Sequence, residues 1–227
     1  MKQIIVMTKN DTHYLRDLLV KLGKNNDYNF HYFFGKSFDL KSILILVYNL
    51  KLYKNYKLLF QIILRIILKR DAKSLLKEKT INNYKQLMEK SKTAYLIISI
   101  SYTKKINPEL FKLPKRGSLN LHLGKLYKYR GLNPVYHALK KEKKIYATLH
   151  EINNQLDSGK IINEIEISSI NKNYNQIYKE IFGASYDLII ESLNFYENDQ
   201  FKSFKVETEK GYYKQLTYRE ILKLFLL

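Results

Sequence analysis

An asparagine and a histidine two residues apart, Asn120 and His122, form the pair in this sequence that is best suited to chemistry. If residues 118–122 are extended, both side chains lie on one face, because side chains alternate along a strand. The amide can donate to a developing oxyanion, and the imidazole can accept or relay a proton near neutral pH. Asp157, on a later polar connection, could hold that imidazole in one tautomer and favour its charged form. These groups together suit acyl transfer, although an Asn-x-His sequence alone also occurs in capped turns and satisfied polar pairs.

Other kinds of active site lack the residues they need. A Rossmann dinucleotide site requires glycines directly after the first strand, where this chain has Thr8, Lys9, Asn10 and Asp11, and a phosphate-binding loop is missing as well. No two of the five histidines have the spacing of a helical zinc pair, and the chain has no cysteine. We therefore expect no metal site and no thiolate chemistry.

The chain of 227 residues is strongly basic, with 40 Lys and Arg against 21 Asp and Glu and a formal charge of +19. Such a charge is typical of proteins that bind nucleic acid or anionic membranes. However, only six of the cationic residues are arginine, and the lysines are spread along the whole chain. RNA-binding modules place aromatic side chains beside arginines on a sheet face, and no such cluster is present. A basic nucleic-acid-binding module is the non-enzyme alternative, and we expect no nucleic-acid partner.

Strands and helices alternate along the chain, which predicts an α/β fold with a doubly wound, Rossmann-like parallel sheet. Asp11 or Thr12 could cap the first helix, and Asn107 precedes a helix that has Pro108 at its first position. The strand-like runs are residues 3–7, 28–34, 94–100, 118–121, 146–151 and 161–167, and the runs with helical spacing are residues 11–22, 135–141 and 174–196.

We expect a core over residues 1–170 and a short C-terminal helix and strand appendage over residues 171–227 that packs on the core or on a dimer partner. The appendage would include a strand at residues 201–206 and a last helix from Thr217, and its apolar end favours a covered face and hence a homodimer. The first residues do not resemble a signal peptide, and lysines interrupt the most lipid-like stretch, residues 42–70. We expect no transmembrane segment and a cytoplasmic location.

From about residue 94 to residue 167, the order of motifs resembles the formyltransferase family that uses 10-formyltetrahydrofolate. The six matching elements are the buried strand 96–101, the turn 102–107, Asn120 with His122, Tyr129-Arg130-Gly131, Thr148 with His150, and Asp157 with Gly159. The resemblance implies a formyltransferase fold with Asn120, His122 and Asp157 as the catalytic trio. The chain departs from the family after His122, where Leu123-Gly124-Lys125-Leu126-Tyr127 replaces Pro-Ser-Leu-Leu-Pro, and before Thr148, where Tyr146-Ala147 replaces Gly-Val.

The resemblance also implies where the two substrates lie. The folate co-substrate would lie between the turn 102–106 and the loop 153–157, and its candidate contacts are Tyr102, Lys104, Lys105, Ile106 and Asn154. The same lysines could instead be merely solvated.

Three further residues are candidates for binding the acceptor, and each has a structural alternative. Arg130 could hold a phosphate or brace its loop, and His150 could approach the acceptor or form a structural hydrogen bond. Tyr212 could stack on a nucleotide base, although paired aromatic residues such as Tyr212 and Tyr213 more often serve a core or a dimer contact.

Two possible formyl acceptors are disfavoured, because this chain lacks features of the enzymes that use them. Methionyl-tRNA formyltransferases carry a further barrel domain, for which the sixty or so residues after Ile167 are too few. Glycinamide ribonucleotide transformylases begin with a glycine-rich loop that is absent here. Residues 129–136 and 211–217 resemble the sugar N-formyltransferases. We therefore expect formyl transfer to a nucleotide-linked amino sugar, dTDP-4-amino-4,6-dideoxyglucose above all, for cell-surface polysaccharide such as O-antigen, with the other two acceptors as alternatives.

Overall fold

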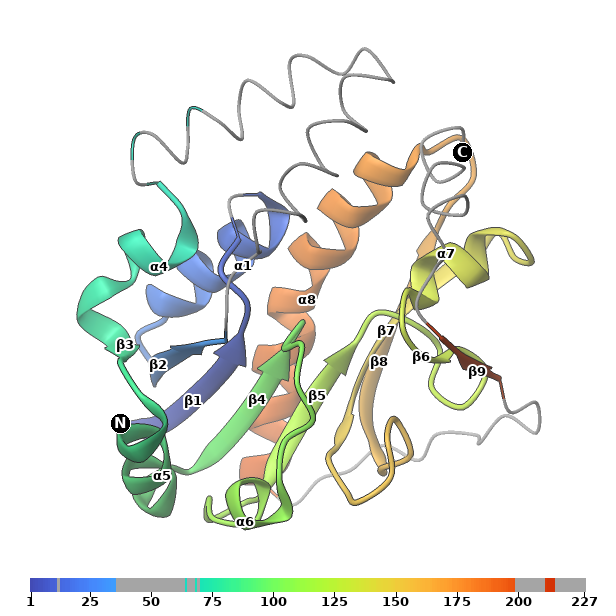
Figure 1. Ribbon diagram of the computed structural model, residues 1–227. Helices are drawn as coiled ribbons and strands as arrows, with labels where there is room; N and C mark the ends of the chain where they lie inside the picture. The colour runs from blue at the N-terminus through green and yellow to red at the C-terminus, as the bar shows by residue number, and fades with distance from the viewer. Residues whose placement is uncertain (12, 36–63, 65–67, 69, 199–210, 215–227) are drawn as a thin grey trace.

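A computed structural model describes residues 1–11, 13–35, 64, 68, 70–198 and 211–214 (Figure 1). Seven strands form one sheet in the order β3-β2-β1-β4-β5-β7-β8, and two short strands, β6 and β9, form a second sheet. The strands of the large sheet are β1 (Lys2–Thr8), β2 (Tyr28–Phe34), β3 (Thr80–Ile81), β4 (Leu96–Ile100), β5 (Ser118–His122), β7 (Lys144–Glu151) and β8 (Ile161–Ser168). The small sheet pairs β6 (Arg130–Gly131) with β9 (Tyr212–Tyr213) in parallel.

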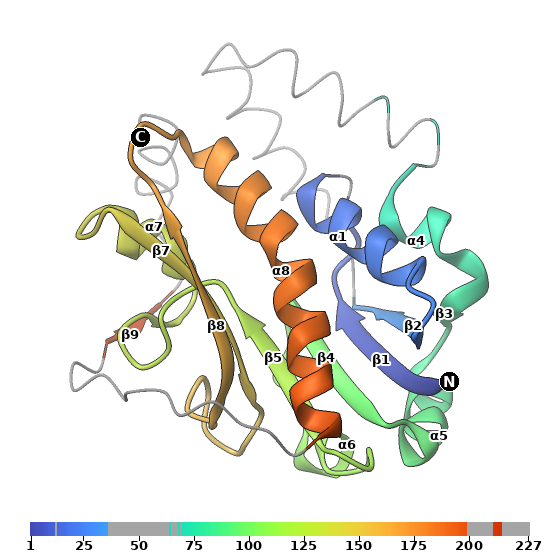
Figure 2. The same ribbon diagram turned by 180° about the vertical axis from the view of Figure 1, so that it is seen from behind.

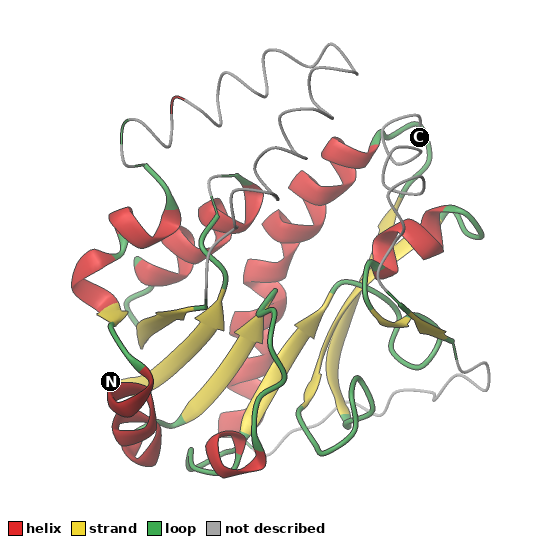
Figure 3. Cartoon of the chain, in the orientation of Figure 1, coloured by secondary structure: helices red, strands yellow, loops and turns green. Residues whose placement is uncertain are grey.

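The expected α/β fold with a mostly parallel, Rossmann-like sheet is confirmed. Strands β1 to β5 pair in parallel, whereas β7 and β8 run antiparallel to their neighbours (Figure 3). β7 is reversed relative to β5, and a short polar connection joins β7 and β8 as a hairpin, so β8 again runs in the direction of β1 to β5. The sequence therefore predicted every strand of the large sheet except β3, but not the reversal of β7.

Helices cover both faces of the large sheet and divide the core in two. On one face, α1 (Tyr14–Gly23) and α8 (Tyr174–Glu197) pack beside each other, and both contribute to the larger apolar cluster (Figure 2). On the other face, α5 (Tyr84–Thr93) and α6 (Pro108–Phe111) bury Leu87, Leu110 and Phe111 in a smaller cluster. The remaining helices are α4 (Ala72–Leu75), the 3-10 helix η1 (Lys77–Lys79) and α7 (Pro134–Leu139).

The core strands form because their side chains are apolar on both faces. All five residues of β4 are buried, as expected for a central strand covered on both sides. Gly117 lies at φ +72° in the turn before β5, where a left-handed conformation favours glycine. β5 starts at Ser118, as the sequence predicts, and because Leu119 and Leu121 join the larger cluster, its polar residues point to the opposite face of the sheet.

The first helix starts later than the sequence predicts. The Asp11 side chain accepts a hydrogen bond from the amide of His13 (2.6 Å) and does not cap the helix, so α1 begins only at Tyr14. Asn107 precedes α6 as expected, with Pro108 in its first turn, but forms no side-chain cap. The other proposed cap, Thr12, the stretch 42–63, the strand at 201–206, the helix from Thr217 and the apolar end lie outside the described residues.

Within the described ranges, no helix is both long enough and apolar enough to cross a bilayer. α8 packs on the sheet beside α1, so at least this part of residues 171–227 contributes to the core. The division of the chain at residue 170 stays a prediction.

A capping box at Asn173 and Gln176 stabilises the first turn of α8, the helix that packs on the larger cluster, and its contribution can be measured. The Asn173 side chain accepts from the amide of Gln176 (3.0 Å), and the Gln176 side chain accepts from the amide of Asn173 (2.8 Å). We expect Asn173→Ala to lower the free energy of unfolding by about 1 kcal/mol, measured by urea denaturation, because the first turn loses this partner. Lys179→Ala, an exposed substitution on the same helix, is the control, and an equal loss in both variants would contradict the prediction.

Candidate active site

β5 places Asn120 and His122 on one face, with neighbours fixed by strand register. Asn120 lies opposite Ser99 of β4 and opposite His150 of β7, and His122 lies opposite Thr148. Residues opposite each other in a sheet share a face, so Ser99, Asn120 and His150 form one row. The antiparallel direction of β7 therefore brings a second histidine beside the Asn-x-His pair.

Asn120 and His150 are joined by a hydrogen bond whose direction follows from the surroundings. His150 is 2 % exposed, and its Nδ1 lies 2.8 Å from the carbonyl oxygen of Glu151. A carbonyl can only accept, so Nδ1 carries the proton and Nε2 of the neutral ring is an acceptor. The Asn120 amide nitrogen, 3.2 Å from that Nε2, is the donor. Its second N–H hydrogen makes no hydrogen bond within the described part of the chain and can serve a ligand.

His122 is held by the same kind of backbone contact. Its Nε2 donates to the carbonyl oxygen of Tyr129 at 2.6 Å, so Nδ1 is the basic nitrogen of the neutral ring. Nδ1 faces the Asp157 Oδ1 atom at 3.7 Å. Burial lowers the pKa of His122, and the negative charge of Asp157 opposes that shift. A proton acceptor thus points at a carboxylate that would stabilise the protonated ring.

Asp157 is a buried carboxylate shared between the two histidines. Its Oδ1 lies 3.6 Å from Nε2 of His150, and its Oδ2 accepts a hydrogen bond from the amide of Gly131 at 2.8 Å. Burial alone would raise the pKa of Asp157, but His150 and His122 in their protonated forms, together with the hydrogen bond from the Gly131 amide, lower it to about 2. The side chain is therefore ionised at neutral pH.

The loop that carries Asp157 is braced from two sides. The Arg130 guanidinium donates to the carbonyl oxygen of Leu156 through Nε (3.2 Å) and Nη2 (2.5 Å), and the Tyr127 hydroxyl donates to that of Gly159 (3.2 Å). A Cβ atom at Gly159 would lie 1.8 Å from the carbonyl oxygen of Glu151, so only glycine fits there. Asp157 itself has a φ of +46°, a left-handed conformation kept by the contacts around it.

The other predicted site residues surround this cluster at different depths. Ile106 is buried in the smaller apolar cluster, where Tyr102 and Ile152 pack against it, whereas Lys104, Lys105 and Asn154 are exposed. Arg130 makes the loop-bracing contact that the sequence left as one of two options, and Tyr212 is 60 % exposed. The roles of these residues in binding stay predictions. Within the described residues, no group of three or more His, Cys, Asp or Glu side chains is arranged to hold a metal ion.

Sequence reasoning missed the main-chain groups that hold the cluster. These are the carbonyl oxygens of Tyr129 and Glu151 and the amide of Gly131. Residue type carries no signal for a backbone acceptor, because every residue has one. Gly131 was named from the sequence as part of the Tyr129-Arg130-Gly131 motif but not for its amide, and its φ of +93° and contact with Tyr213 leave no room for a side chain.

The two lowered pKa values predict how stability depends on pH. As the pH falls, the unfolded chain takes up a proton on His122 near pH 6.5 and on Asp157 near pH 3.8. The folded chain takes up both protons only at lower pH, because both pKa values are lowered in it. Stability should therefore fall as the pH drops below 6.5, and fall again between 3.8 and about 2, where the Asp157 shift contributes about 2 kcal/mol. The stability difference between wild type and Asp157→Asn, measured by urea denaturation, should shrink across this second window. Asp187→Asn, at an exposed carboxylate of α8, is the control, and a constant Asp157→Asn difference would refute the assignment.

Comparison with known proteins identifies the arrangement. The formyl transferase family matches residues 51–193 of the chain. A methionyl-tRNA formyltransferase of Thermotoga neapolitana is 31 % identical over 130 residues, which are 56 % of this chain and 41 % of that protein. The chain thus spans well under half the length of this relative.

Two solved structures share the fold. The formyltransferase PseJ from Anoxybacillus kamchatkensis, in complex with UDP-4,6-dideoxy-4-formamido-L-AltNAc and tetrahydrofolate, superposes with a TM-score of 0.54 at 19 % identity, over 93 % of this chain and 85 % of that one. The sugar 3N-formyl transferase WlaRD, solved with dTDP and 5-N-formyl-THF, gives a TM-score of 0.60 at 17 % identity, over 95 % and 70 %. Because the family match spans more than half of the 227 residues and includes Asn120, His122 and Asp157, the chain belongs to the formyl transferase family.

Proposed function

We propose that this protein transfers a formyl group from 10-formyltetrahydrofolate to the amine of a nucleotide-linked amino sugar. The observation that carries the proposal is the cluster of half-buried Asn120 with buried His122 and Asp157, which combines a free amide N–H, a basic imidazole nitrogen and an ionised carboxylate. An acyl transfer to an amine needs these three functions: a donor for the oxyanion, an acceptor for the amine proton and a charge that stabilises the acceptor once protonated.

In the proposed mechanism, the folate supplies an activated formyl group, and the sugar amine attacks its carbon. Asn120 donates its unused N–H to the oxygen, which gains negative charge as the carbon becomes tetrahedral. His122 accepts the amine proton at Nδ1, and Asp157, 3.7 Å from that atom, stabilises the imidazolium. The intermediate then collapses: the bond to N10 of the folate breaks, His122 returns a proton to that nitrogen, and the formamide is released.

The folate would lie beside the smaller apolar cluster. Ile106 and Tyr102, from the turn after β4, and Ile152, at the start of the loop 153–157, all pack in that cluster, so the turn and the loop border a common surface. An apolar surface of this kind suits the flat pterin ring, and its backbone groups can read the pterin edge. Exposed Lys104, Lys105 and Asn154 are then placed to meet the acidic tail of the folate.

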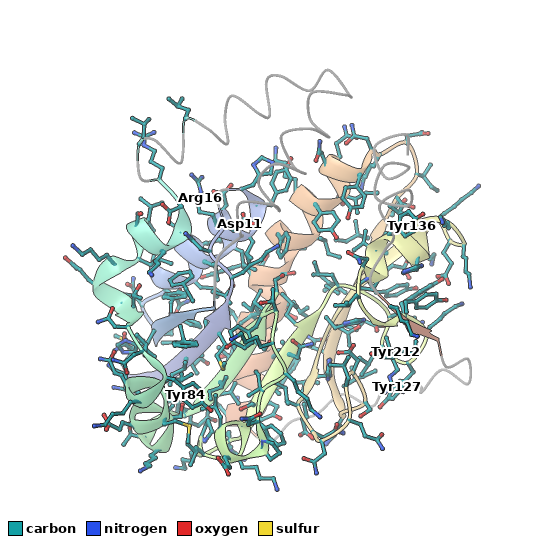
Figure 4. All side chains as sticks on the ribbon, in the orientation of Figure 1. Asp11, Arg16, Tyr84, Tyr127, Tyr136 and Tyr212 are labelled. Carbon is teal, nitrogen blue, oxygen red and sulfur yellow. The ribbon has the colours of Figure 1, made fainter. Side chains whose placement is uncertain are left out.

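The acceptor would lie on the side of β6 and β9. Tyr212 is largely exposed, so its ring can stack on a nucleobase (Figure 4), and Arg130 lies opposite it in the strand register. His150 belongs to this proposal as the partner of Asn120. We propose dTDP-4-amino-4,6-dideoxyglucose as acceptor, a cytoplasmic location and a homodimer. The basic charge of +19 would speed capture of both acidic substrates.

Methionyl-tRNA is the second candidate acceptor, because the relative from Thermotoga neapolitana is a methionyl-tRNA formyltransferase. Glycinamide ribonucleotide and a non-enzymatic, nucleic-acid-binding role are the remaining alternatives. Purified protein incubated with formyl-folate and each acceptor separately should formylate the amino sugar alone, detected as the mass of one formyl group. Product only with methionyl-tRNA or glycinamide ribonucleotide would overturn the sugar assignment, and product with none would overturn the enzymatic one.

Single substitutions in the trio should abolish turnover without unfolding the protein. Removing one oxyanion donor costs about 10²- to 10³-fold in kcat, so we expect a loss of this size in Asn120→Ala and losses of at least this size in His122→Ala and Asp157→Ala. Circular dichroism and a tetrahydrofolate-binding assay would check that the fold and the folate site persist. Asp187→Ala, at an exposed carboxylate, is the control for Asp157→Ala, and near-normal turnover in His122→Ala would refute the role given to that histidine.

A further inference from the structure

A segment near the C-terminal end is hydrogen-bonded along the loop that follows His122. The amide of Gly211 donates to the carbonyl oxygen of Tyr127 (2.9 Å), and the amide of Arg130 donates to that of Gly211 (3.0 Å). The amide of Leu132 donates to the carbonyl oxygen of Tyr213 (2.9 Å). Three backbone hydrogen bonds thus tie residues 211–213 to residues 127–132, and we call this pairing the β6–β9 clamp. Tyr127 and Tyr212 lie close together at this side of the molecule (Figure 4).

Two glycines let the backbones in the β6–β9 clamp approach this closely. A Cβ atom at Gly131 would lie 2.2 Å from the carbonyl oxygen of Tyr213, and one at Gly211 would lie 2.2 Å from that of Lys128. Either contact is far below the van der Waals distance, so a side chain at either position would push the two segments apart. The clamp therefore depends on glycine on both of its strands.

Side chains hold the clamp in place as well. The ring of Tyr213 stacks on His137 of α7, with centroids 4.1 Å apart, and on Tyr129, with centroids 5.8 Å apart. The Lys141 ammonium donates to the Tyr213 hydroxyl (3.2 Å), and the Tyr129 hydroxyl donates to Glu142 (2.6 Å). Offset aromatic stacks of this type add to the free energy of burial, so the stack fixes Tyr129 as well as Tyr213.

The clamped segment is also the one that holds two members of the trio. The carbonyl oxygen of Tyr129 accepts from Nε2 of His122, and the amide of Gly131 donates to Oδ2 of Asp157. Arg130, between them, holds the carbonyl oxygen of Leu156, next to Asp157. A movement of residues 129–131 would therefore displace both partners of the His122 and Asp157 pair.

We infer that Tyr213 is a positioning residue, which through the β6–β9 clamp fixes the tautomer of His122 and its separation from Asp157. The inference rests on the proposed function for its effect on turnover, but the positioning itself exists without substrates. Tyr213 acts through Tyr129 and Gly131 and does not touch the reacting atoms.

The test compares Tyr213→Ala, which removes the stack, with Tyr213→Phe, which keeps the ring and loses only the contact with Lys141. In Tyr213→Ala we expect kcat to fall about 100-fold, since small displacements of catalytic groups cost about this much, with the KM for folate nearly unchanged. Tyr213→Phe should recover most of the turnover. Gly211→Ala pushes the two backbones of the same clamp apart, and it replaces Tyr213→Ala as the test variant if that protein does not fold.

A second readout needs no substrate. Nitrogen-15 NMR of histidine-labelled protein should report the Nε2–H tautomer and a low titration midpoint for His122, whose charged or titratable neighbours in the cluster are Asp157 and His150. In Tyr213→Ala and Gly211→Ala the midpoint should rise towards that of an exposed histidine, because water reaches the ring. Tyr186→Ala is the matched control, since Tyr186 of α8 is also half-buried beside a lysine and loses comparable packing far from the site.

The outcomes separate the two proposals. An unchanged His122 titration with unchanged kcat in folded Tyr213→Ala would overturn the positioning role, as would equal shifts in Tyr186→Ala. A shifted titration in a protein that formylates no acceptor would support the clamp and refute the proposed function.

Discussion

A negative charge buried between two histidines constrains the whole site. An isolated carboxylate in a protein interior would take up a proton, because burial disfavours its charged form. Asp157 stays ionised because the amide of Gly131 on β6 donates to it and because the rings of His122 of β5 and His150 of β7 attract its charge when they are protonated. These groups come from three separate stretches of chain, so the strands and the loop must all be in place before the charge is compensated. The fold and the chemistry of the site are coupled through this one carboxylate.

The reversal of the sheet at β7 brings groups of the site together. Residues 123–143, which include α7, connect β5 to β7, and β7 runs antiparallel to β5. The antiparallel β7 lies along β5 so that His150 and Thr148 face Asn120 and His122 in register, and it then runs directly into the loop that carries Asp157. β7 thus places His150 beside the Asn120 amide and leads into the loop that carries the Asp157 carboxylate. The register shift between β7 and β8 falls at Leu149 and His150, close to this point.

The sequence was most informative where a signal is carried by side chains. The strand at Ser118–His122 was predictable from its apolar pattern after a Gly-containing turn, and the shared face of Asn120 and His122 follows from strand geometry alone. The pairing of His122 with Asp157 was only one possibility from the residues alone, and the family resemblance made it specific, since residues far apart in a sequence carry no spacing signal. The predicted start of α1 was wrong because the Asp11 side chain accepts from the nearby amide of His13 and does not cap the helix. Helix propensities do not distinguish these two local hydrogen bonds. β6 and β9 were not predictable as strands, because two-residue strands show no periodicity.

Backbone carbonyl groups decide what the two histidines can do. Each ring gives one N–H to a carbonyl oxygen, His122 from Nε2 to Tyr129 and His150 from Nδ1 to Glu151, so each neutral ring keeps its other nitrogen as an acceptor. The acceptor of His150 is used by Asn120, which orients the amide, whereas that of His122 points at Asp157 and is left for a proton. Two chemically identical side chains thereby take different tasks, one structural and one basic. The difference arises from which ring nitrogen meets a main-chain oxygen, so the loop geometry at Tyr129, and with it the β6–β9 clamp, sets the chemistry of His122.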